Sequence, residues 1–231
     1  MINNLFNLKN NNAIITGGAG LLGKEHAIAL SMFQCRVHLI DINKKKLTAA
    51  KEYILNFNRR AKIYLHLVNI TNENEVKKLS DDLLKKNIKI DILVNNAAID
   101  PKMNHLDSNS NSVEKYDTND LFQELNVGLV GSFICCKVFG SIMAKYKKGS
   151  IINIASDLAI SGPDQRVYSA NEKIQDVKNF KPIGYPIVKS GLLGLNRYFA
   201  TYWAHKGVRV NCLVPGAVKN TQSKSLVNNI K

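Results

Sequence analysis

The sequence lacks the cysteine patterns of metal-binding and disulfide-stapled proteins. Its four cysteines, Cys35, Cys135, Cys136 and Cys212, form no C-x-x-C pair and no Cys/His cluster with zinc spacing. Because they lie within apolar runs, we expect reduced, buried thiols, no metal site and a cytoplasmic protein. The five histidines are dispersed along the chain, and we interpret each of them as structural.

Long apolar runs are also missing. The segment 1–12 is rich in Asn and has no apolar stretch of the kind that defines a secretory signal. No stretch approaches eighteen consecutive apolar residues, which is roughly what a membrane-spanning helix requires. We therefore expect no membrane partner.

Acidic side chains are scarce, with 18 Asp and Glu against 32 Lys and Arg and a formal charge of +14. Such a balance can indicate nucleic acid, an anionic surface or an anionic small ligand, or a bias in composition alone. The lysines are scattered, with the longest run at residues 44–46, and no aromatic residues alternate with them. We therefore expect a small-molecule substrate and no nucleic-acid partner.

Short apolar runs alternate with longer stretches of helical pattern. Strands are expected at residues 13–15, 36–40, 62–68, 90–94, 150–155 and 208–214, and helices at residues 21–33, 44–58, 73–86, 121–146 and 186–205. This alternation predicts an α/β protein with one Rossmann domain over residues 1–231, a doubly wound parallel sheet in three α/β/α layers. Ligands of such sheets bind at the carboxyl ends of the strands.

A glycine-rich loop, T-G-G-A-G-L-L-G at residues 16–23, joins the first predicted strand to the first helix. Glycines permit a tight turn, and backbone N–H groups at a helix N-terminus bind a pyrophosphate. The loop therefore supplies the candidate cofactor-binding residues Thr16, Gly17, Gly18, Gly20, Leu22 and Gly23.

Asp41 ends the second predicted strand. A carboxylate there can accept hydrogen bonds from both adenosine ribose hydroxyls and would repel a 2′-phosphate, so NAD is favoured over NADP. Its alternative role is to cap the helix that starts near Asn43.

Tyr185 and Lys189 form a Y-x-x-x-K pattern at the start of the last predicted helix. Residues four apart share a helix face, and Pro186 suits the first turn. We expect the ammonium to lower the pKa of Tyr185 toward working pH, so that the phenol exchanges a proton with a substrate oxygen. Chance alone often produces this pattern, but Ser156, the segment 95–98 and the pair 215–216 all follow predicted strands at the same sheet edge.

Together these segments resemble the short-chain dehydrogenase/reductase superfamily along nearly the whole chain. The resemblance implies an NAD(P)-dependent oxidoreductase in which Tyr185 is the general acid/base and Lys189 holds the nicotinamide ribose. It implies that Ser156 orients the reacting oxygen and that Asn126 supports a proton relay through water. The further cofactor-binding residues that it implies are Asn69, Ile70, Asn96, Ala97, Ala98, Tyr185, Lys189, Pro215 and Gly216. Asn69 stands where the family usually has Asp, which should weaken one hydrogen bond near the adenine.

Finer features, at residues 17–23, 95–102, 156–158, 163–166 and 197–203, resemble flagellin-modification oxidoreductases of the PtmA type. That resemblance implies a sugar-like substrate in a bacterial surface-sugar pathway, and a homodimer or homotetramer. The spacing of the loop glycines resembles nucleotide-sugar epimerases and dehydratases, which stay open as an alternative. A dinucleotide-binding remnant without catalysis is a third.

Two departures from the family pattern stand out. The segment 158–181 is a polar insertion, which we expect to be either a lid over the substrate or a surface excursion. As a lid it would offer Asp164, Gln165 and Arg166, together with the preceding Asp157, as substrate contacts. The chain also ends soon after Gly216, so we expect a sheet without the family's usual last helix and strand, and an open edge at the sixth strand.

Overall fold

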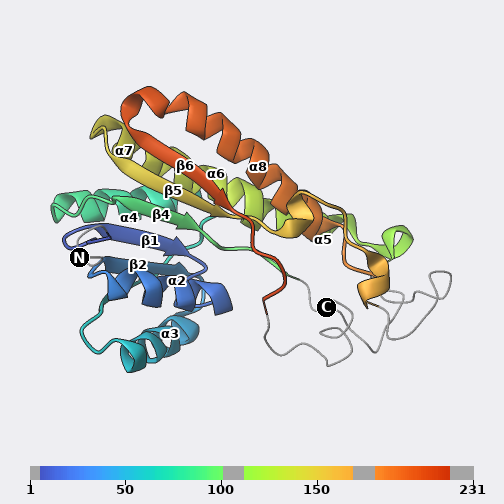
Figure 1. Ribbon diagram of the computed structural model, residues 1–231, viewed down its shortest axis with the longest axis horizontal. Coiled ribbons are helices and arrows are strands. Elements are labelled where there is room, and N and C mark those ends of the chain that lie inside the picture. Colours follow the sequence, from blue (N-terminus) through green and yellow to red (C-terminus); the bar gives the residue numbers. More distant parts are fainter. Residues whose placement is uncertain (1–5, 101–111, 169–179, 219–231) are drawn as a thin grey trace.

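The computed structural model describes residues 6–100, 112–168 and 180–218. Its centre is a six-stranded parallel sheet with the order β3-β2-β1-β4-β5-β6 (Figure 1). The strands are β1 (Asn12–Thr16), β2 (Arg36–Asp41), β3 (Lys62–Leu67), β4 (Ile92–Asn95), β5 (Gly149–Ile154) and β6 (Val208–Leu213). The expected doubly wound Rossmann architecture is therefore confirmed. Within the described residues, β6 pairs with β5 alone.

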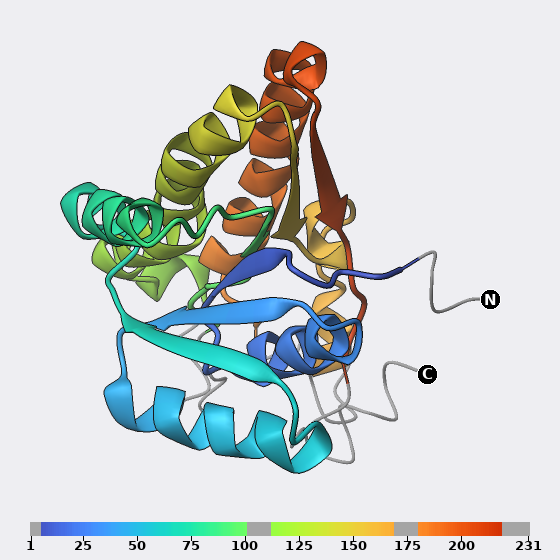
Figure 2. The ribbon, with the colours of Figure 1, turned by 90° about the vertical axis from the view of Figure 1, so that its left-hand side faces the viewer.

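Helices cover both faces of the sheet, as the edge view in Figure 2 shows. One face carries α2 (Leu21–Met32) and α3 (Lys44–Phe57). The other carries α4 (Glu73–Lys85), α8 (Gly184–Tyr202) and a long helix, assigned as α5 (Thr118–Leu125), η2 (Asn126–Val130), α6 (Gly131–Cys135), η3 (Cys136–Gly140) and α7 (Ser141–Lys145). Short helical turns lie at η1 (Val113–Lys115), η4 (Asp157–Ala159), η5 (Gln165–Tyr168) and η7 (Ala204–Lys206).

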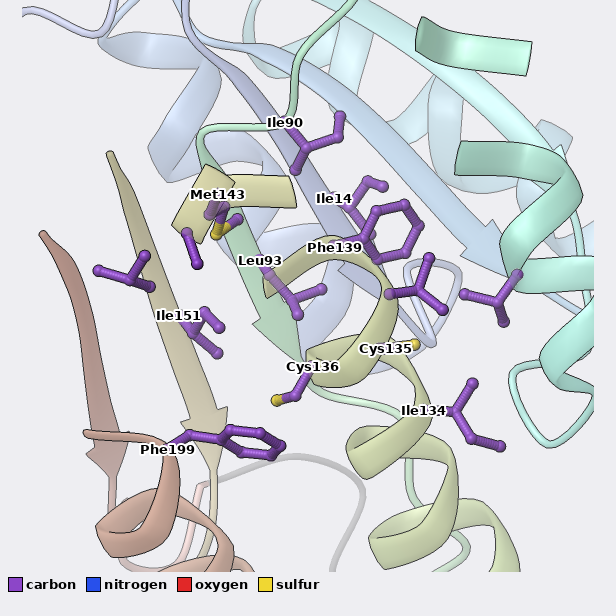
Figure 3. Close-up of a cluster of buried hydrophobic side chains, with 14 of the residues drawn as sticks. Ile14, Ile90, Leu93, Ile134, Cys135, Cys136, Phe139, Met143, Ile151 and Phe199 are labelled. Carbon is purple, nitrogen blue, oxygen red and sulfur yellow. The ribbon is translucent and has the colours of Figure 1, made fainter. Parts of the chain in front are cut away.

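The central strands are apolar because helices exclude water from both of their faces. Every residue of β1 is buried, and the first residue of β1 pairs with the first of β2, so the hydrogen-bond ladders run in register. The hydrophobic core between the sheet and the long helix contains Ile14, Leu93 and Phe139, which point toward one another in Figure 3. Deleting any one of these buried side chains would leave a cavity and cost about 2–5 kcal/mol.

The long helix starts three residues before its predicted start, because Asp117 caps it. The Asp117 carboxylate accepts a hydrogen bond from the backbone N–H of Asn119 at 2.8 Å. Two π-helical turns, at η2 and η3, interrupt its regular hydrogen bonding. In the described part of the chain, this is the one helix that is long and apolar enough to cross a bilayer, although polar residues interrupt its apolar sequence. We interpret it as a core helix, since Phe139 and Met143 are buried against the sheet.

The thiols agree with the sequence prediction. All four cysteines are unpaired, and Cys35, Cys135 and Cys136 are buried while Cys212 is partly exposed. Cys135 and Cys136 lie on the side of the long helix that faces the core (Figure 3). Burial raises the pKa of both thiols, which keeps them protonated and unreactive.

Two histidines on β2 and β3 form a pair in which His38 is buried and His66 is half-buried. His38 Nδ1 lies 2.9 Å from His66 Nε2, and the His38 ring stacks on Tyr64 with 4.7 Å between ring centroids. His38 is 1% exposed, and its Nε2 has no hydrogen-bond partner. Burial, followed by the charges of His66 and Arg36, lowers the pKa of His38 to about 4. The fold therefore holds His38 neutral.

This pair predicts a pH-dependent stability. Because the pKa of His38 in the folded state lies below the unfolded value of about 6.5, the unfolded chain takes up the proton first as pH falls. His38 alone should lower the free energy of unfolding by about 2 kcal/mol between pH 7 and pH 5. We expect His38→Phe to remove that part of the pH dependence in urea denaturation, and the exposed control His205→Gln to leave it unchanged. An equal slope in wild type and His38→Phe would contradict this account.

Candidate functional site

The glycine loop is pressed against the end of β4. Gly17 has φ +59°, and a Cβ there would lie 2.8 Å from the Cα of Ala97, so this position requires glycine. Thr16 Oγ1 accepts hydrogen bonds from the backbone N–H groups of Asn96 at 3.0 Å and Ala97 at 3.1 Å. The Asn96 amide donates in return to the carbonyl oxygens of Thr16 and Gly17. These contacts lock the ends of the two central strands together.

The N-terminus of α2 is suited to an anion. Its N-cap is Gly20, which offers no side-chain acceptor, whereas Asn43 and Asn72 cap α3 and α4 with their side chains. No acidic residue lies in its first turn. The first N–H groups of α2 therefore point out of the helix without a side-chain partner, which is the arrangement that binds a dinucleotide pyrophosphate.

Asp41 lies beside this loop at the end of β2. One carboxylate oxygen accepts a hydrogen bond from the Ala19 N–H at 3.3 Å, and the other accepts from Asn43 at 3.1 Å. Because Asn43 itself caps α3, the alternative role of Asp41 as that helix's cap is wrong. The loop, the α2 N-terminus and the Asp41 carboxylate together fit a dinucleotide, and Asp41 is positioned to meet its adenosine ribose.

Ser156, Tyr185 and Lys189 meet beyond the carboxyl end of β5. Ser156 follows the strand, and Tyr185 and Lys189 share one face of the first turns of α8. The Ser156 hydroxyl is hydrogen-bonded to Tyr185 and donates to the Asp157 carboxylate at 2.7 Å. The Lys189 ammonium is buried and donates to the carbonyl oxygen of Ile154 at 2.7 Å.

The protonation of this group differs from the sequence prediction. The pKa of Tyr185 is raised to about 12, mainly by burial and next by the Asp100 carboxylate, while the hydrogen bond with Ser156 lowers it. The expected lowering by Lys189 was wrong, because its ammonium turns to Ile154 and lies 5.4 Å from the Tyr185 ring centroid. Burial also lowers the pKa of Lys189 to about 8. Desolvation therefore outweighs the motif's own cation in this structure.

A chain of buried amides supports the site from below. Asn95 Nδ2 donates to Asn153 Oδ1 at 2.8 Å, and Asn153 Nδ2 donates to Asn196 Oδ1 at 3.1 Å. These hydrogen bonds link the ends of β4 and β5 to α8, so they fix the helix of Tyr185 and Lys189 relative to the strand that Ser156 follows. Sequence reasoning missed Asn153 and Asn196. The signal was present for Asn153, a polar residue in a buried strand position that only a hydrogen-bonded partner permits.

Asn126 begins the first π-helical turn and is exposed. Gly128 within that turn allows close contact with α8, because a Cβ there would collide with Val188. Asn126 therefore lies on the helix turn that packs against the helix of Tyr185. Ile70 is buried where the long helix passes, against Gly131, and the Asn69 side chain is occupied locally by Thr71.

The predicted lid contacts do not converge on Tyr185. Asp164 and Arg166 are exposed and pair with each other, with the Arg166 Nε 2.8 Å from an Asp164 oxygen. Gln165 accepts a hydrogen bond from the backbone N–H of Lys181 at 2.8 Å, which ties the start of the insertion to its end. Residues 169–179 of the predicted lid lie outside the described residues.

Asp157, by contrast, lies at the site. Besides holding Ser156, it donates its backbone N–H to the carbonyl oxygen of Pro215 at 3.1 Å. A Cβ on Gly216 would lie 3.9 Å from the Asp157 carboxylate. The segment after β6 therefore reaches the catalytic group, as its predicted place at the sheet edge implies. Ala98 and Leu22 lie in the segments that flank the cofactor edge, after β4 and in the first turn of α2.

Two further groups were not anticipated from sequence. The Lys181 ammonium lies 4.2 Å from the Tyr185 ring centroid and 2.7 Å from Asp100. Tyr116 and the buried Glu124 form a short hydrogen bond beneath the start of α8, and burial is the main cause that raises the pKa of both. The Lys181 contact joins distant parts of the chain, and no local sequence pattern predicts either group. Among the described residues, no cluster of His, Cys, Asp and Glu could hold a metal ion.

Known proteins resemble the chain along most of its length. The family described as enoyl-(acyl carrier protein) reductase matches residues 18–230. A short-chain dehydrogenase/reductase from Gibberella zeae, dpfgG, is 32% identical over 224 residues, which are 96% of this chain and 74% of that protein.

Solved structures share the fold. An NAD+-bound short-chain dehydrogenase from Leptospira borgpetersenii has a TM-score of 0.80 at 24% identity, covering 99% of this chain and 79% of its own. A gluconate 5-dehydrogenase from Burkholderia cenocepacia, solved with NADP and tartrate, has a TM-score of 0.78 at 22% identity, covering 99% and 79%. The extent of these matches, with the glycine loop and the Ser156, Tyr185 and Lys189 group in place, shows that the chain belongs to the short-chain dehydrogenase/reductase superfamily of NAD(P)-dependent oxidoreductases, which act on alcohols and ketones.

Proposed function

We propose that this chain interconverts a secondary alcohol and a ketone on a sugar or sugar-derived substrate, with NAD as its cofactor. The meeting of Ser156, Tyr185 and Lys189 beside the glycine loop carries the proposal. When bound, the nicotinamide supplies or accepts a hydride. The chain's own residues must then orient the reacting oxygen and move one proton, which is what a hydrogen-bonded serine and tyrosine do.

The protonation state of Tyr185 suits it to donate a proton. With a pKa near 12, the phenol keeps its proton at physiological pH and is ready to give it to a ketone oxygen. In the oxidative direction the same phenol must first lose that proton, which requires a cation nearby or an alkaline solution. The Ser156 hydroxyl is hydrogen-bonded to Tyr185, so it is positioned to orient a substrate oxygen next to the phenol.

The preference for NAD is supported by Asp41. Its carboxylate, anchored by Ala19 and Asn43, lies at the end of β2 where a 2′-phosphate would be repelled. The sugar substrate is supported by the loop segments that resemble flagellin-modification oxidoreductases, and by the gluconate 5-dehydrogenase of similar fold. Four unpaired cysteines favour a reducing compartment, so we place the reaction in the cytoplasm.

We propose a homodimer that forms through the groove between the long helix and α8. This groove, of about 480 Å³, is lined by Leu129, Val130, Phe133, Gly191, Gly194, Leu195, Tyr198 and Phe199. Phe133 and Tyr198 in this lining are 43% and 60% exposed, so the groove presents an exposed apolar patch of the kind that marks an interaction surface. A chain with a net charge of +14 repels its own copies, and this uncharged surface is where a second copy approaches at least cost.

Removing the Tyr185 hydroxyl tests the chemistry. We expect Tyr185→Phe to lower turnover by about a hundredfold or more while NADH binding persists, because the phenyl ring keeps its packing but carries no proton. The measurement is the absorbance of NADH with ketoses, and of NAD+ with polyols and sugar acids. Tyr146→Phe, a partly exposed tyrosine at the end of the long helix, serves as the matched control. Full turnover by Tyr185→Phe would exclude acid/base chemistry at this residue, and product formation without net redox change would favour an epimerase.

Asp41 should determine the choice of cofactor. We expect wild type to bind NADH more tightly than NADPH, and Asp41→Asn to narrow that ratio by about tenfold, since the amide keeps an acceptor but loses the repulsion. Fluorescence titration of both nucleotides measures it. Glu52→Gln, an exposed charge change on α3, should leave the ratio unchanged. Tighter NADPH binding by wild type would overturn the NAD assignment.

The groove predicts a concentration-dependent dimer. Gly194 faces open space, so Gly194→Arg should block a second copy without disturbing the monomer. Light scattering after size exclusion should then report a dimer for wild type and a monomer for Gly194→Arg. Gly162→Arg, at a loop glycine that also faces open space, is the control and should remain dimeric. A monomeric wild type would refute self-association through this surface.

A further inference from the structure

Lys181 brings a second cation to the catalytic tyrosine. It lies four residues before Tyr185, in the segment that precedes α8, whereas Lys189 lies four residues after Tyr185, within α8. Its Nζ is 4.2 Å from the Tyr185 ring centroid, and its side chain is only 11% exposed. The motif's own Lys189 is farther from the ring, at 5.4 Å.

Two contacts hold Lys181 in place. Its ammonium lies 2.7 Å from Asp100 Oδ1, on the segment that follows β4. Its backbone N–H donates to Gln165 Oε1 at 2.8 Å. The ion pair thus joins the segment after β4 to the start of α8 beside the catalytic group. Ordering a lysine side chain costs conformational entropy, and the contacts at its backbone N–H and at its ammonium offset that cost.

The two lysines differ in what their charges do. The Lys189 ammonium is committed to the Ile154 carbonyl oxygen, and burial favours its neutral form. The Lys181 ammonium instead pairs with the Asp100 carboxylate and lies over the ring of Tyr185. A phenolate spreads its negative charge into the ring, so a cation over the ring face attracts the phenolate more strongly than the phenol.

We propose that Lys181 is a second cation that stabilises the phenolate form of Tyr185, and that the carboxylate charge of its ion-pair partner Asp100 opposes this effect. Lys181 acts through Tyr185 and is therefore a positioning residue. The inference rests on the proposed role of Tyr185 as the proton carrier, but it can be tested on Tyr185 itself, without a substrate.

The effect of Asp100 on the pKa of Tyr185 has a direction that can be measured. Its carboxylate is the second cause, after burial, that raises the pKa of Tyr185. Its side chain is 61% exposed, so it can move away from the site more easily than Lys181 can. The other groups that face Tyr185 are the Ser156 hydroxyl, the Asp157 carboxylate, the Tyr168 phenol and the Lys189 ammonium. None of these side chains is itself replaced in the variants below, although the charge of Asp100 also raises the pKa of Lys189 and of Tyr168, and the charge of Lys181 lowers that of Lys189.

The test is a titration of Tyr185 in the full chain without cofactor. All eight tyrosines are replaced by 3-fluorotyrosine, whose phenol is more acidic, and each gives a fluorine NMR signal. The signal that disappears in Tyr185→Phe belongs to Tyr185. We expect Asp100→Asn to lower the pKa of this phenol by about one unit, because a like charge is removed while the amide oxygen can still accept a hydrogen bond from Lys181.

The decisive variant adds Lys181→Met to Asp100→Asn. We expect the pKa of Tyr185 to rise again by about one unit, because the cation is lost, and Asp100→Asn with Lys181→Arg to stay near the Asp100→Asn value. Adding the exposed control Lys206→Met to Asp100→Asn should change nothing. The other tyrosine signals report in each case that the fold is intact.

Two results would overturn the proposal. An unchanged or lower Tyr185 pKa on adding Lys181→Met would show that Lys181 does not stabilise the phenolate. Should Lys181→Met instead disturb the other tyrosine signals, Lys181→Gln in the same background replaces it, and an unchanged pKa there is equally decisive. Failure of the proposed function is distinct, since full turnover by Tyr185→Phe removes the catalytic role but leaves the titration as it is.

Discussion

The contact between the ends of β1 and β4 is the constraint on which the rest of the site depends. These are the two central strands, where the chain reverses its direction of winding, and any ligand of the sheet must lie beyond them. Four hydrogen bonds join residues 16–17 to residues 96–97 there, and two of them are between Thr16 and Asn96. With the loop held in this way, the N-terminus of α2 and the Asp41 carboxylate face the same edge as Ser156.

Burial dominates the electrostatics of the catalytic group. Desolvation raises the pKa of Tyr185 and lowers that of Lys189, so burial opposes the charged form of each residue. Charges brought from elsewhere in the chain then decide the balance. Asp100 raises the pKa of Tyr185 further. Its ion-pair partner Lys181, which is 81 residues away in sequence, lies over the Tyr185 ring.

The same side chains that build the site also show why part of it escaped prediction. The Y-x-x-x-K pattern and the glycine loop are local, and helix geometry alone places their residues on one face or one turn. The direction in which the Lys189 ammonium points is not local, because it depends on the Ile154 carbonyl that β5 brings to α8. The sequence of the polar insertion likewise suggested Asp164 and Arg166 as substrate contacts. In the structure these two neighbouring, oppositely charged side chains form an ion pair with each other.

The sequence by itself determined the strand and helix order, the parallel sheet, the edge at which ligands bind and the residues that stand there, since these follow from apolar periodicity and short motifs. It also predicted buried, unpaired thiols, and all of them except the partly exposed Cys212 are buried. Only the tertiary structure decided the amide chain from Asn95 to Asn196, the partner of Asp41, the direction of the Tyr185 pKa shift and the cation over its ring. The physical reason is that desolvation and charge depend on every group within a few ångströms, and folding brings those groups together from segments that no local pattern connects.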